Sequence, residues 1–363
     1  MKILFLTYYS NRGGSSRYMI HDYIDHFREA GFHFDVEPLL GDWYLKYLLE
    51  KGRNERSKLQ LTKYVVFAYL KRLKALLNSR QYDLVYFDAD LWPFLPYLVY
   101  KLTLQLPYIA SFDEAIYSRY NNHKNPLIKF FNQKKIEKVM VQARYIVTWN
   151  PTVASYARSL NNNVIELGLG IDLARYRQKK WDIHSNHSDL NNLIQISWIG
   201  TPSGFNYLRY VDPVFRDLSK KYDITLRVIS SKPYQIDGVK TINREWSLKT
   251  EVDDLLESHI GIMPLPETEW ASGKSGCKML QYMGVGIPAV VSPVGINAEV
   301  IENGQNGFLA GSLFEWSDIL EKLILDNQLR RDVGLRGREY VENNNSLEKN
   351  AEVLIGMLKK ICN

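Results

Sequence analysis

Short apolar runs alternate with amphipathic stretches along most of the chain. In the first half, runs typical of buried strands are found at residues 2–8, 34–38, 84–87, 108–111, 145–148 and 164–166. The intervening stretches carry apolar residues at helical spacing, beginning with residues 17–30 after a glycine turn at 11–16. Strand, glycine turn and helix in this order are typical of a parallel sheet covered by helices on both faces. The pattern therefore predicts a doubly wound α/β domain that closes near Gly170.

A second series of the same kind follows a polar stretch. Residues 172–192 lose the periodicity and become rich in Asn, His and Ser, as an interdomain linker does. Beyond them, strand-like runs lie at 193–199, 225–229, 260–263 and 289–292, and helical patterns at 316–325 and 347–361. We therefore predict two Rossmann-like domains, residues 1–171 and 193–345, with a C-terminal helix at 346–363 that is compatible with packing back on the first domain. Ligands of open parallel sheets bind beyond the carboxyl ends of the strands, so a crevice between facing domains is the expected substrate site.

Length and composition suit two packed cores. The 363 residues exceed what one hydrophobic core usually supports, and 45% hydrophobic with 24% charged residues is ordinary for a globular protein. Cys277 and Cys362 are far apart and lack metal-ligand spacing, which argues against a disulfide framework or a zinc site. The chain opens on a strand pattern without the features of a secretory signal, and its most apolar run, 91–106, is interrupted by prolines, a lysine and tyrosines. We expect a cytoplasmic protein without a spanning helix.

Residues 43–80 combine many cations with few acids. The basic residues include Lys46, Lys51, Arg53, Arg56, Lys58, Lys63, Lys71, Arg72 and Lys74. Aromatic and aliphatic residues are interleaved with them, as in helices that lie on an anionic membrane. An ordinary amphipathic helix with a solvated basic face has the same pattern. Both interpretations stay open: peripheral contact with the inner face of the cell membrane, and a plain solvated helix. Nucleic-acid binding is not expected, since no recognition module accompanies the charge.

The segment 269–292 carries the strongest chemical signal. It reads EWASGKSGCKMLQYMGVGIPAVVS, a glycine-rich turn followed by a helix and then a Gly-x-Pro-x-Val-Val strand. Unpaired amides and the dipole at the start of a helix stabilise an anion without a metal. The segment resembles the family-4 retaining glycosyltransferases, in a subgroup that reads Gly-Lys, Lys and Leu-Gln-Tyr-Met. The resemblance continues through residues 294–299, 303–309 and 326–346, and upstream through residues 167–172.

This resemblance implies the GT-B fold, in which two Rossmann-like domains face a central cleft, and a nucleotide-sugar donor. The donor-binding residues that it implies are Gly13, Gly14, Ser15, Gly200, Gly273, Ser275, Gly276, Gln281 and Glu299. The sequence departs from the family pattern in two places. The usual pair of glutamates eight positions apart is replaced by Gly273 and Gln281, and the turn after Gly200 lacks the usual arginine and lysine. Lys274 and Lys278 are the candidates to neutralise the diphosphate instead, and Gln281 can hydrogen-bond a ribose hydroxyl without a charge.

Two acidic residues directly follow the predicted strand 108–111. Asp113 and Glu114 stand where many relatives carry a histidine near the transferred sugar, and with Lys274 and Lys278 they are the catalytic candidates. They would hydrogen-bond the acceptor or stabilise positive charge at the sugar carbon. The plain alternative is a helix N-cap with an acidic first turn.

Three further patterns have simpler explanations. A Gly-Gly pair after a strand, here Gly13-Gly14, is often only a tight turn. Asp88-x-Asp90 resembles the metal-binding Asp-x-Asp of the other glycosyltransferase fold, but it lies in the first domain, away from the donor signature. The seven histidines show no metal-ligand pairing. No metal or other cofactor is therefore expected.

The resemblance implies a retaining glycosyltransferase that moves a sugar from a nucleotide diphosphate-sugar to a hydroxyl acceptor, and with two lysines at the donor segment we expect it to be metal-independent. The resemblance suggests a carbohydrate or lipid-linked acceptor, in glycan or cell-surface polysaccharide synthesis. No carboxylate stands at a persuasive position for a double-displacement nucleophile, so we expect front-face substitution with the leaving diphosphate accepting the acceptor proton. The alternatives are a nucleotide-sugar 2-epimerase on the same scaffold and a non-catalytic carbohydrate- or partner-binding relative with an eroded site.

Overall fold

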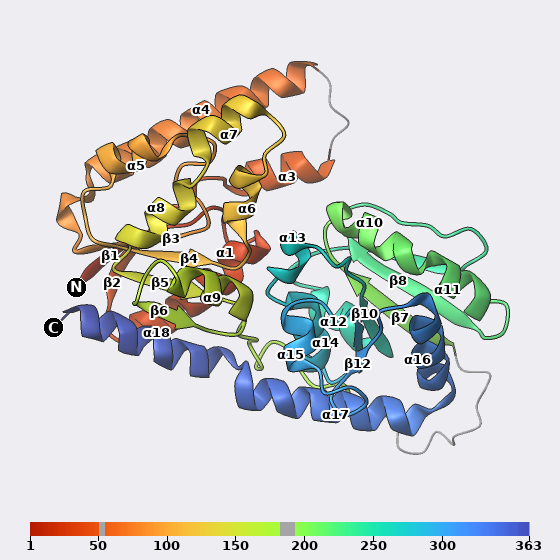
Figure 1. Cartoon of the computed structure of the whole chain (residues 1–363). Helices are drawn as coiled ribbons and strands as arrows, with labels where there is room; N and C mark the ends of the chain where they lie inside the picture. Colours follow the sequence, from red (N-terminus) through yellow and green to blue (C-terminus); the bar gives the residue numbers. More distant parts are fainter. Residues whose placement is uncertain (51–54, 182–192, 363) are drawn as a thin grey trace. The chain divides into compact units, whose positions relative to one another are not determined.

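The computed structural model describes residues 1–50, 55–181 and 193–362. By their contacts the residues form two compact units (Figure 1). The first comprises Met1–Gly170, Gly273–Ser275 and Leu347–Asn363, and the second comprises Ile171–Ser272 and Gly276–Ser346. The long C-terminal helix α18 (Leu347–Cys362) therefore belongs to the first unit.

The first unit is built on a six-stranded sheet with the strand order β2-β1-β3-β4-β5-β6, and every pairing is parallel. Its strands are β1 (Lys2–Leu6), β2 (His33–Val36), β3 (Leu84–Asp88), β4 (Tyr108–Phe112), β5 (Tyr145–Thr148) and β6 (Val164–Glu166). Alternate residues of β1 enter two different core clusters. Ile3 and Phe5 pack with α18, and Leu4 and Leu6 pack in the cluster on the other face. The central strands are thus buried on both faces, as parallel sheets usually are.

Helices cover both faces of this sheet. They are α1 (Gly14–Met19), α2 (Ile24–Glu29), α3 (Asp42–Glu50), α4 (Glu55–Leu77), α5 (Tyr97–Thr103), α6 (Ile116–Asn121), α7 (Pro126–Asn132), α8 (Lys135–Gln142), α9 (Pro151–Arg158) and α18. In its described part, the long helix α4 buries only a narrow stripe, Ala68, Arg72 and Leu76. Such a stripe leaves most of the α4 surface uncovered by the rest of the unit.

The second unit repeats the plan, with a parallel sheet in the order β12-β11-β10-β7-β8-β9. Its strands are β7 (Ile194–Ile199), β8 (Ile224–Ser230), β9 (Thr241–Glu245), β10 (Ile260–Met263), β11 (Ala289–Val291) and β12 (Phe308–Leu309). Its helices are α10 (Phe205–Leu208), α11 (Asp212–Leu218), α12 (Glu251–Leu256), α13 (Glu269–Ser272), α14 (Cys277–Gly284), α15 (Ile296–Val300), α16 (Leu313–Leu325) and α17 (Asn327–Asn344). The two sheets confirm the predicted pair of doubly wound α/β folds.

Local expectations differ from the structure in two respects. The two edge strands β9 and β12 were not predicted, because β9 is largely exposed and β12 is only two residues long, so neither carries a buried apolar run. Residues 17–30, expected as one helix, instead form α1, a 3-10 turn at His21–Tyr23, and α2. Ile20 leaves helical dihedral angles, and Ile20, Tyr23 and Phe27 all fill one core cluster. Tertiary packing overrides the local helical pattern there.

Candidate functional site

Two glycines mark the start of α1, after the first strand of the first unit. A Cβ atom on Gly13 would lie 2.3 Å from the Cβ atom of Tyr9, so the backbone packs against Tyr9 and admits no side chain. At Gly14 a Cβ atom would meet nothing within 4 Å. Gly13 is therefore explained by packing alone, whereas Gly14 borders open space next to Ser15.

Asp113 lies one residue beyond β4 and is fixed from two directions. Its carboxylate accepts a hydrogen bond from the Ser15 hydroxyl, and its backbone carbonyl accepts one from Asn150 Nδ2 at 3.0 Å. Burial, and next the neighbouring charge of Glu114, raise the pKa of the Asp113 carboxyl above its usual range. A positioned carboxyl with a raised pKa is a candidate for binding or exchanging a substrate proton.

Lys274 faces the second acidic residue of this segment. Its Nζ atom forms an ion pair with Glu114 Oε1 at 2.9 Å, and both side chains are partly exposed. Together with Ser15 and Asp113, these residues form the acidic cluster of the first unit: Ser15, Asp113, Glu114 and Lys274. The structure thus brings together four of the residues singled out from the sequence.

Gly273 is packed so closely that it admits no side chain. A Cβ atom there would lie 2.7 Å from the Cβ atom of Ala115, and the Gly273 carbonyl accepts a hydrogen bond from Asn150 Nδ2 at 2.9 Å. Any side chain at this position, a glutamate included, would clash with Ala115. Ser275, the last residue of the segment Gly273–Ser275, is buried.

Asn150 is a further candidate site residue, one that the sequence patterns did not indicate. Its amide nitrogen bonds the carbonyls of both Asp113 and Gly273, while its Oδ1 atom caps α9 by accepting from Val153 N. The sequence does signal the helix start, since Asn followed by Pro shortly after a strand is a strong N-cap pattern. What the sequence does not give is the second set of partners.

In the second unit, a glycine and a lysine mark the start of α14. Gly276 has φ +67°, a left-handed conformation that glycine adopts without strain. Lys278 follows in the first turn, with its Nζ atom 5.7 Å from the centre of the Trp198 ring on β7, within cation–π range. A Cβ atom on Gly200 would lie 2.8 Å from Lys278 Cε, so glycine at 200 makes room for the lysine stem. A cation is thereby held where β7 ends and α14 begins.

The Gln281 side chain is buried in the second unit, not exposed as a ligand-binding side chain at the surface would be. It is 4% exposed, and its amide donates to the Tyr176 hydroxyl at 2.7 Å. Tyr176 in turn donates to Glu251 at 3.0 Å, and Glu251 also accepts from Trp246 at 2.8 Å. The predicted contact between Gln281 and a ribose hydroxyl stays a prediction. Glu299 is exposed on α15, and its predicted role in donor binding likewise stays a prediction.

The Asp88-x-Asp90 pair has structural partners. Asp90 is fully buried and accepts from Lys135 Nζ at 2.7 Å and from the Tyr100 hydroxyl at 2.5 Å. Asp88 is also buried, and desolvation raises the pKa of its carboxyl to about 6. Within the described ranges, no group of three or more His, Cys, Asp or Glu residues is placed to hold a metal ion. Asp90 is thus the partner of a buried lysine, and the absence of a metal stays a prediction.

The basic stretch 43–80 needs one correction. Arg72 does not contribute to a basic surface, because its guanidinium is buried and donates to the carbonyls of Thr7 at 2.6 Å and Glu37 at 3.1 Å. Lys51 and Arg53 lie outside the described residues. Among the others, Lys58, Lys63 and Lys74 are exposed on α4, and Lys71 pairs with Glu37. No helix in the described part of the chain is both long and apolar enough to cross a membrane.

Comparisons place this architecture among known folds. No family model matches the sequence, and a search of the curated proteins gives no match. The structure is similar to sucrose-phosphate synthase from Thermosynechococcus elongatus, with 12% identity, a TM-score of 0.66, and coverage of 99% of this chain and 98% of that one. It is similar to HepE from Anabaena solved with UDP-glucose, at 13% identity and TM-score 0.65, over 99% and 100% of the two chains. A glycosyltransferase from Rickettsia africae matches at 14% identity and TM-score 0.65, over 99% and 98%. The shared fold is the GT-B fold.

Proposed function

We propose that this protein is a retaining glycosyltransferase that transfers a sugar from a nucleotide diphosphate-sugar to a hydroxyl acceptor without a metal ion. The observation that carries the proposal is the acidic cluster at the carboxyl end of β4, in which a carboxyl of raised pKa and a carboxylate paired with Lys274 lie beside Ser15. The carboxyl ends of parallel strands are where ligands of such sheets bind. The GT-B fold and the resemblance of residues 269–292 to family-4 enzymes support the same conclusion, as does the likeness to a structure solved with UDP-glucose.

In the proposed reaction, the acceptor hydroxyl oxygen attacks the anomeric carbon from the face on which the diphosphate leaves. The bond between that carbon and the diphosphate oxygen breaks with its electron pair on the oxygen, which then takes up the hydroxyl proton. Lys274 and Lys278, with the backbone amides that start α14, offset the charge on the leaving diphosphate. Asp113 and Glu114 position the acceptor hydroxyl and stabilise positive charge at the sugar carbon.

We also propose that the first unit lies on an anionic membrane surface. The evidence is the exposed face of α4, which carries Lys58, Lys63 and Lys74 and, between them, the exposed apolar residues Val66 and Phe67. Apolar side chains at headgroup depth and lysines near lipid phosphate are the features of an interfacial helix. A lipid-linked hydroxyl acceptor in cell-surface glycan synthesis would suit an enzyme attached in this way.

The donor is tested with a thermal-shift panel of UDP-, GDP-, ADP-, CMP- and dTDP-sugars, each with and without EDTA, followed by a nucleotide-release assay. We expect stabilisation by one class of nucleotide-sugar that persists in EDTA. Loss of that stabilisation in EDTA would contradict the metal-independent mechanism. Isomerisation of the donor without an acceptor would indicate a 2-epimerase, and binding without nucleotide release would indicate a non-catalytic relative.

The role of Lys274 is tested with Lys274→Ala. A charge-assisted hydrogen bond contributes about 1.5–3 kcal/mol, so we expect the KM for the donor to rise at least about tenfold. Lys322→Ala on α16 is the matched control, because Lys322 also pairs with a carboxylate but lies on an exposed helix face. Donor affinity and turnover unchanged in Lys274→Ala, with the same unfolding midpoint as the control, would remove Lys274 from the mechanism.

A further inference from the structure

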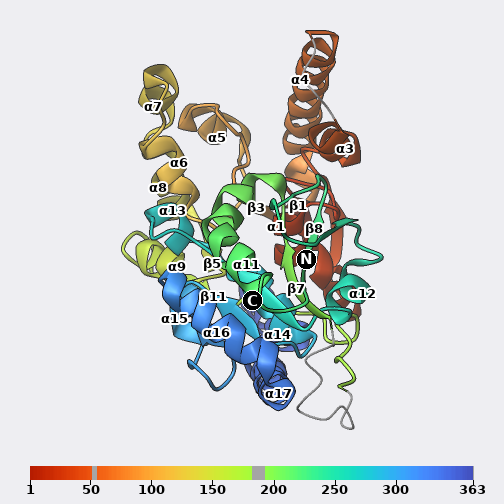
Figure 2. The ribbon, with the colours of Figure 1, turned by 90° about the vertical axis from the view of Figure 1, so that its right-hand side faces the viewer.

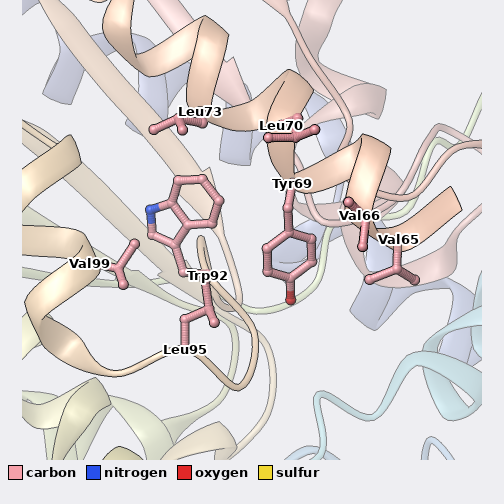
Figure 3. A pocket seen from close by; sticks show the side chains of 8 residues that line it. All are labelled: Val65, Val66, Tyr69, Leu70, Leu73, Trp92, Leu95 and Val99. Atoms are coloured by element: carbon pink, nitrogen blue, oxygen red, sulfur yellow. The ribbon is translucent and has the colours of Figure 1, made fainter. Parts of the chain in front are cut away.

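An apolar groove runs between α4 and α5 in the first unit (Figure 3). Its volume is about 340 Å³, within the range of small-ligand sites. It is lined by Val65, Val66, Tyr69, Leu70, Leu73, Trp92, Leu95 and Val99. The rings of Tyr69 and Trp92 lie between the aliphatic side chains, with their centres 5.7 Å apart. None of these residues belongs to the acidic cluster or to the start of α14.

The groove has no polar side-chain group to offer to a ligand. The Tyr69 hydroxyl donates to the Pro93 carbonyl at 2.6 Å, and the Trp92 indole nitrogen donates to the Thr103 hydroxyl at 2.9 Å. These are the only hydrogen-bonding side-chain groups among the lining residues. A sugar, a nucleotide or a polar peptide would lose its hydrogen bonds to water there without replacement. The occupant that fits is a hydrocarbon chain.

The surface around the groove is also apolar. The following large hydrophobic residues are each more than half exposed: Val66, Phe67 and Leu70 on α4, Leu98 and Leu102 on α5, and Leu127, Phe130 and Phe131 on α7. Figures 1 and 2 both show these three helices at the same end of the first unit. Phe94, in the loop that lines the groove, is exposed and has φ +60°, a conformation rare for a bulky residue. Large exposed apolar residues gathered on neighbouring helices are a feature of interaction sites.

The charges on both walls have one sign. Residues 58–77 and 91–107 contain no Asp or Glu, and their charged side chains are all Lys or Arg. Of these, Lys63 and Lys74 are exposed on α4 and Lys101 is exposed on α5. An anionic headgroup would be attracted to such a surface, while a cationic one would be repelled.

We propose that this groove binds one acyl chain of an anionic phospholipid from the membrane on which the protein lies. The inference rests on the membrane attachment proposed above and does not depend on the identity of the donor. The headgroup would lie among the exposed lysines, and the chain would occupy the space between α4 and α5. A lipid held in this way would fix the depth and orientation of the first unit on the membrane.

The experiment uses the full-length protein and a long-chain alkyl phosphate that carries bromine on its chain, kept below its micelle concentration. Bromine quenches tryptophan fluorescence at short range, and Trp92 lines the groove. We expect saturable quenching, loss of the saturable component in Trp92→Phe, and weaker binding of a brominated neutral alkyl glycoside. Val66→Asp should weaken alkyl phosphate binding at least about tenfold, because it places an unpaired charge at an apolar site.

Val353→Asp on α18 is the matched control, since Val353 is 45% exposed and Val66 is 54% exposed, both in the first unit. We expect it to bind alkyl phosphate as the natural protein does. Quenching that is unaffected by Trp92→Phe, or binding that is unaffected by Val66→Asp, would overturn the proposal. So would equal affinity for the neutral and anionic probes. The soluble probe measures binding in the groove without a membrane. Sedimentation with phosphatidylglycerol vesicles measures membrane attachment, and nucleotide release measures sugar transfer. Each proposal can therefore fail without the other two.

Discussion

Gly273 and Gln281 stand where the family-4 glycosyltransferases, which residues 269–292 resemble, have two glutamates, and the surroundings of the two residues differ. At Gly273 the backbone packs against Ala115, so the missing side chain is a steric necessity. At Gln281 a side chain of the same length is kept, and its amide joins the buried network of Tyr176 and Glu251. A glutamate at 281 would place a second carboxylate close to Glu251, and the neutral amide avoids that repulsion. The first departure is therefore a change of backbone packing, and the second is a change of charge.

Asp113 is expected to favour activity at the expense of stability. Its folded-state pKa is raised, so between the ordinary carboxyl value and the raised value the folded protein binds more protons than the unfolded protein. Stability then falls as pH rises through that interval. Asp113→Asn removes this pH-dependent loss, so the variant should be at least as stable as the natural protein at about pH 8. Its turnover should fall about a hundredfold or more if Asp113 positions the acceptor hydroxyl.

The measurements are urea unfolding at about pH 5 and about pH 8, with nucleotide release at each pH. The exposed Asp237→Asn is the control and should change neither quantity. Full turnover in Asp113→Asn would restrict this carboxylate to a structural role.

At the scale of elements, a buried ion pair fixes the loop between β3 and α5. Lys135 at the start of α8 reaches Asp90 and also donates to the carbonyls of Trp92 and Leu95, both at 3.1 Å. The loop that lines the apolar groove is thus attached to α8. Both charged side chains are fully buried, so each depends on the other.

Lys135→Met should lower the free energy of unfolding by about 3–5 kcal/mol, because it leaves Asp90 buried without its counter-ion. The double variant Asp90→Leu/Lys135→Met should recover part of that loss, since no charge then remains in the pocket. Lys322→Met, which breaks an exposed pair, should cost less than about 1 kcal/mol. Urea unfolding measures all three, and a cost for Lys135→Met as small as that of the control would contradict this view of the pair.

Helix α14 is seated on its sheet through one tyrosine and one glycine. The Tyr282 hydroxyl donates to the Ile262 carbonyl at 3.0 Å and accepts from the Ile199 amide at 3.1 Å. The ring lies directly over Gly261 of β10, where a Cβ atom would be 2.2 Å from it. This close approach positions the start of α14, and with it Gly276 and Lys278, relative to the strand ends.

Gly261→Ala should therefore destabilise the protein by about 1–3 kcal/mol or more through overpacking. Gly356→Ala is an opposite control, because Gly356 lies within α18 and a Cβ atom there meets nothing within 4 Å. It should stabilise by about 0.5–1 kcal/mol through helix propensity. Thermal or urea unfolding measures the change in stability of each variant. Equal changes for Gly261→Ala and Gly356→Ala would show that the Tyr282 ring can move aside to admit a Cβ atom at 261.

At the scale of the whole molecule, the first unit carries the proposed membrane surface as well as the acidic cluster. The fold that surrounds them is shared with sucrose-phosphate synthase and HepE over 99% of the chain. Identities of 12% and 13% mean that this architecture is kept while most side chains have changed. Differences between such proteins are therefore expected in surfaces and loops, of which the face of α4 and α5 is one.

Membrane attachment is tested by sedimentation with phosphatidylglycerol vesicles. Neutralising Lys63 and Lys74 together to Gln should weaken binding by about 2 kcal/mol, roughly thirtyfold, since each lysine near an anionic surface contributes about 1 kcal/mol. Lys359→Gln/Lys360→Gln on α18 makes the same change in net charge at another exposed site and should bind nearly as the natural protein does. Binding should also weaken with added salt. Equal losses in both double variants would indicate attraction by net charge rather than by this face.

The sequence by itself determined the class of the fold, because strand and helix periods are local and parallel sheets covered on both faces require continuous apolar runs. It also located the glycine turn at Gly276, from glycines that precede a helical pattern, and the carboxylates after β4, which come just beyond a strand end. Only the tertiary structure decided which polar residues face inward. Arg72 and Asp90 look like surface charges in the sequence, yet one is held by carbonyls and the other by Lys135. Their partners lie 65 and 45 residues away along the chain, and no local pattern encodes a contact at that separation.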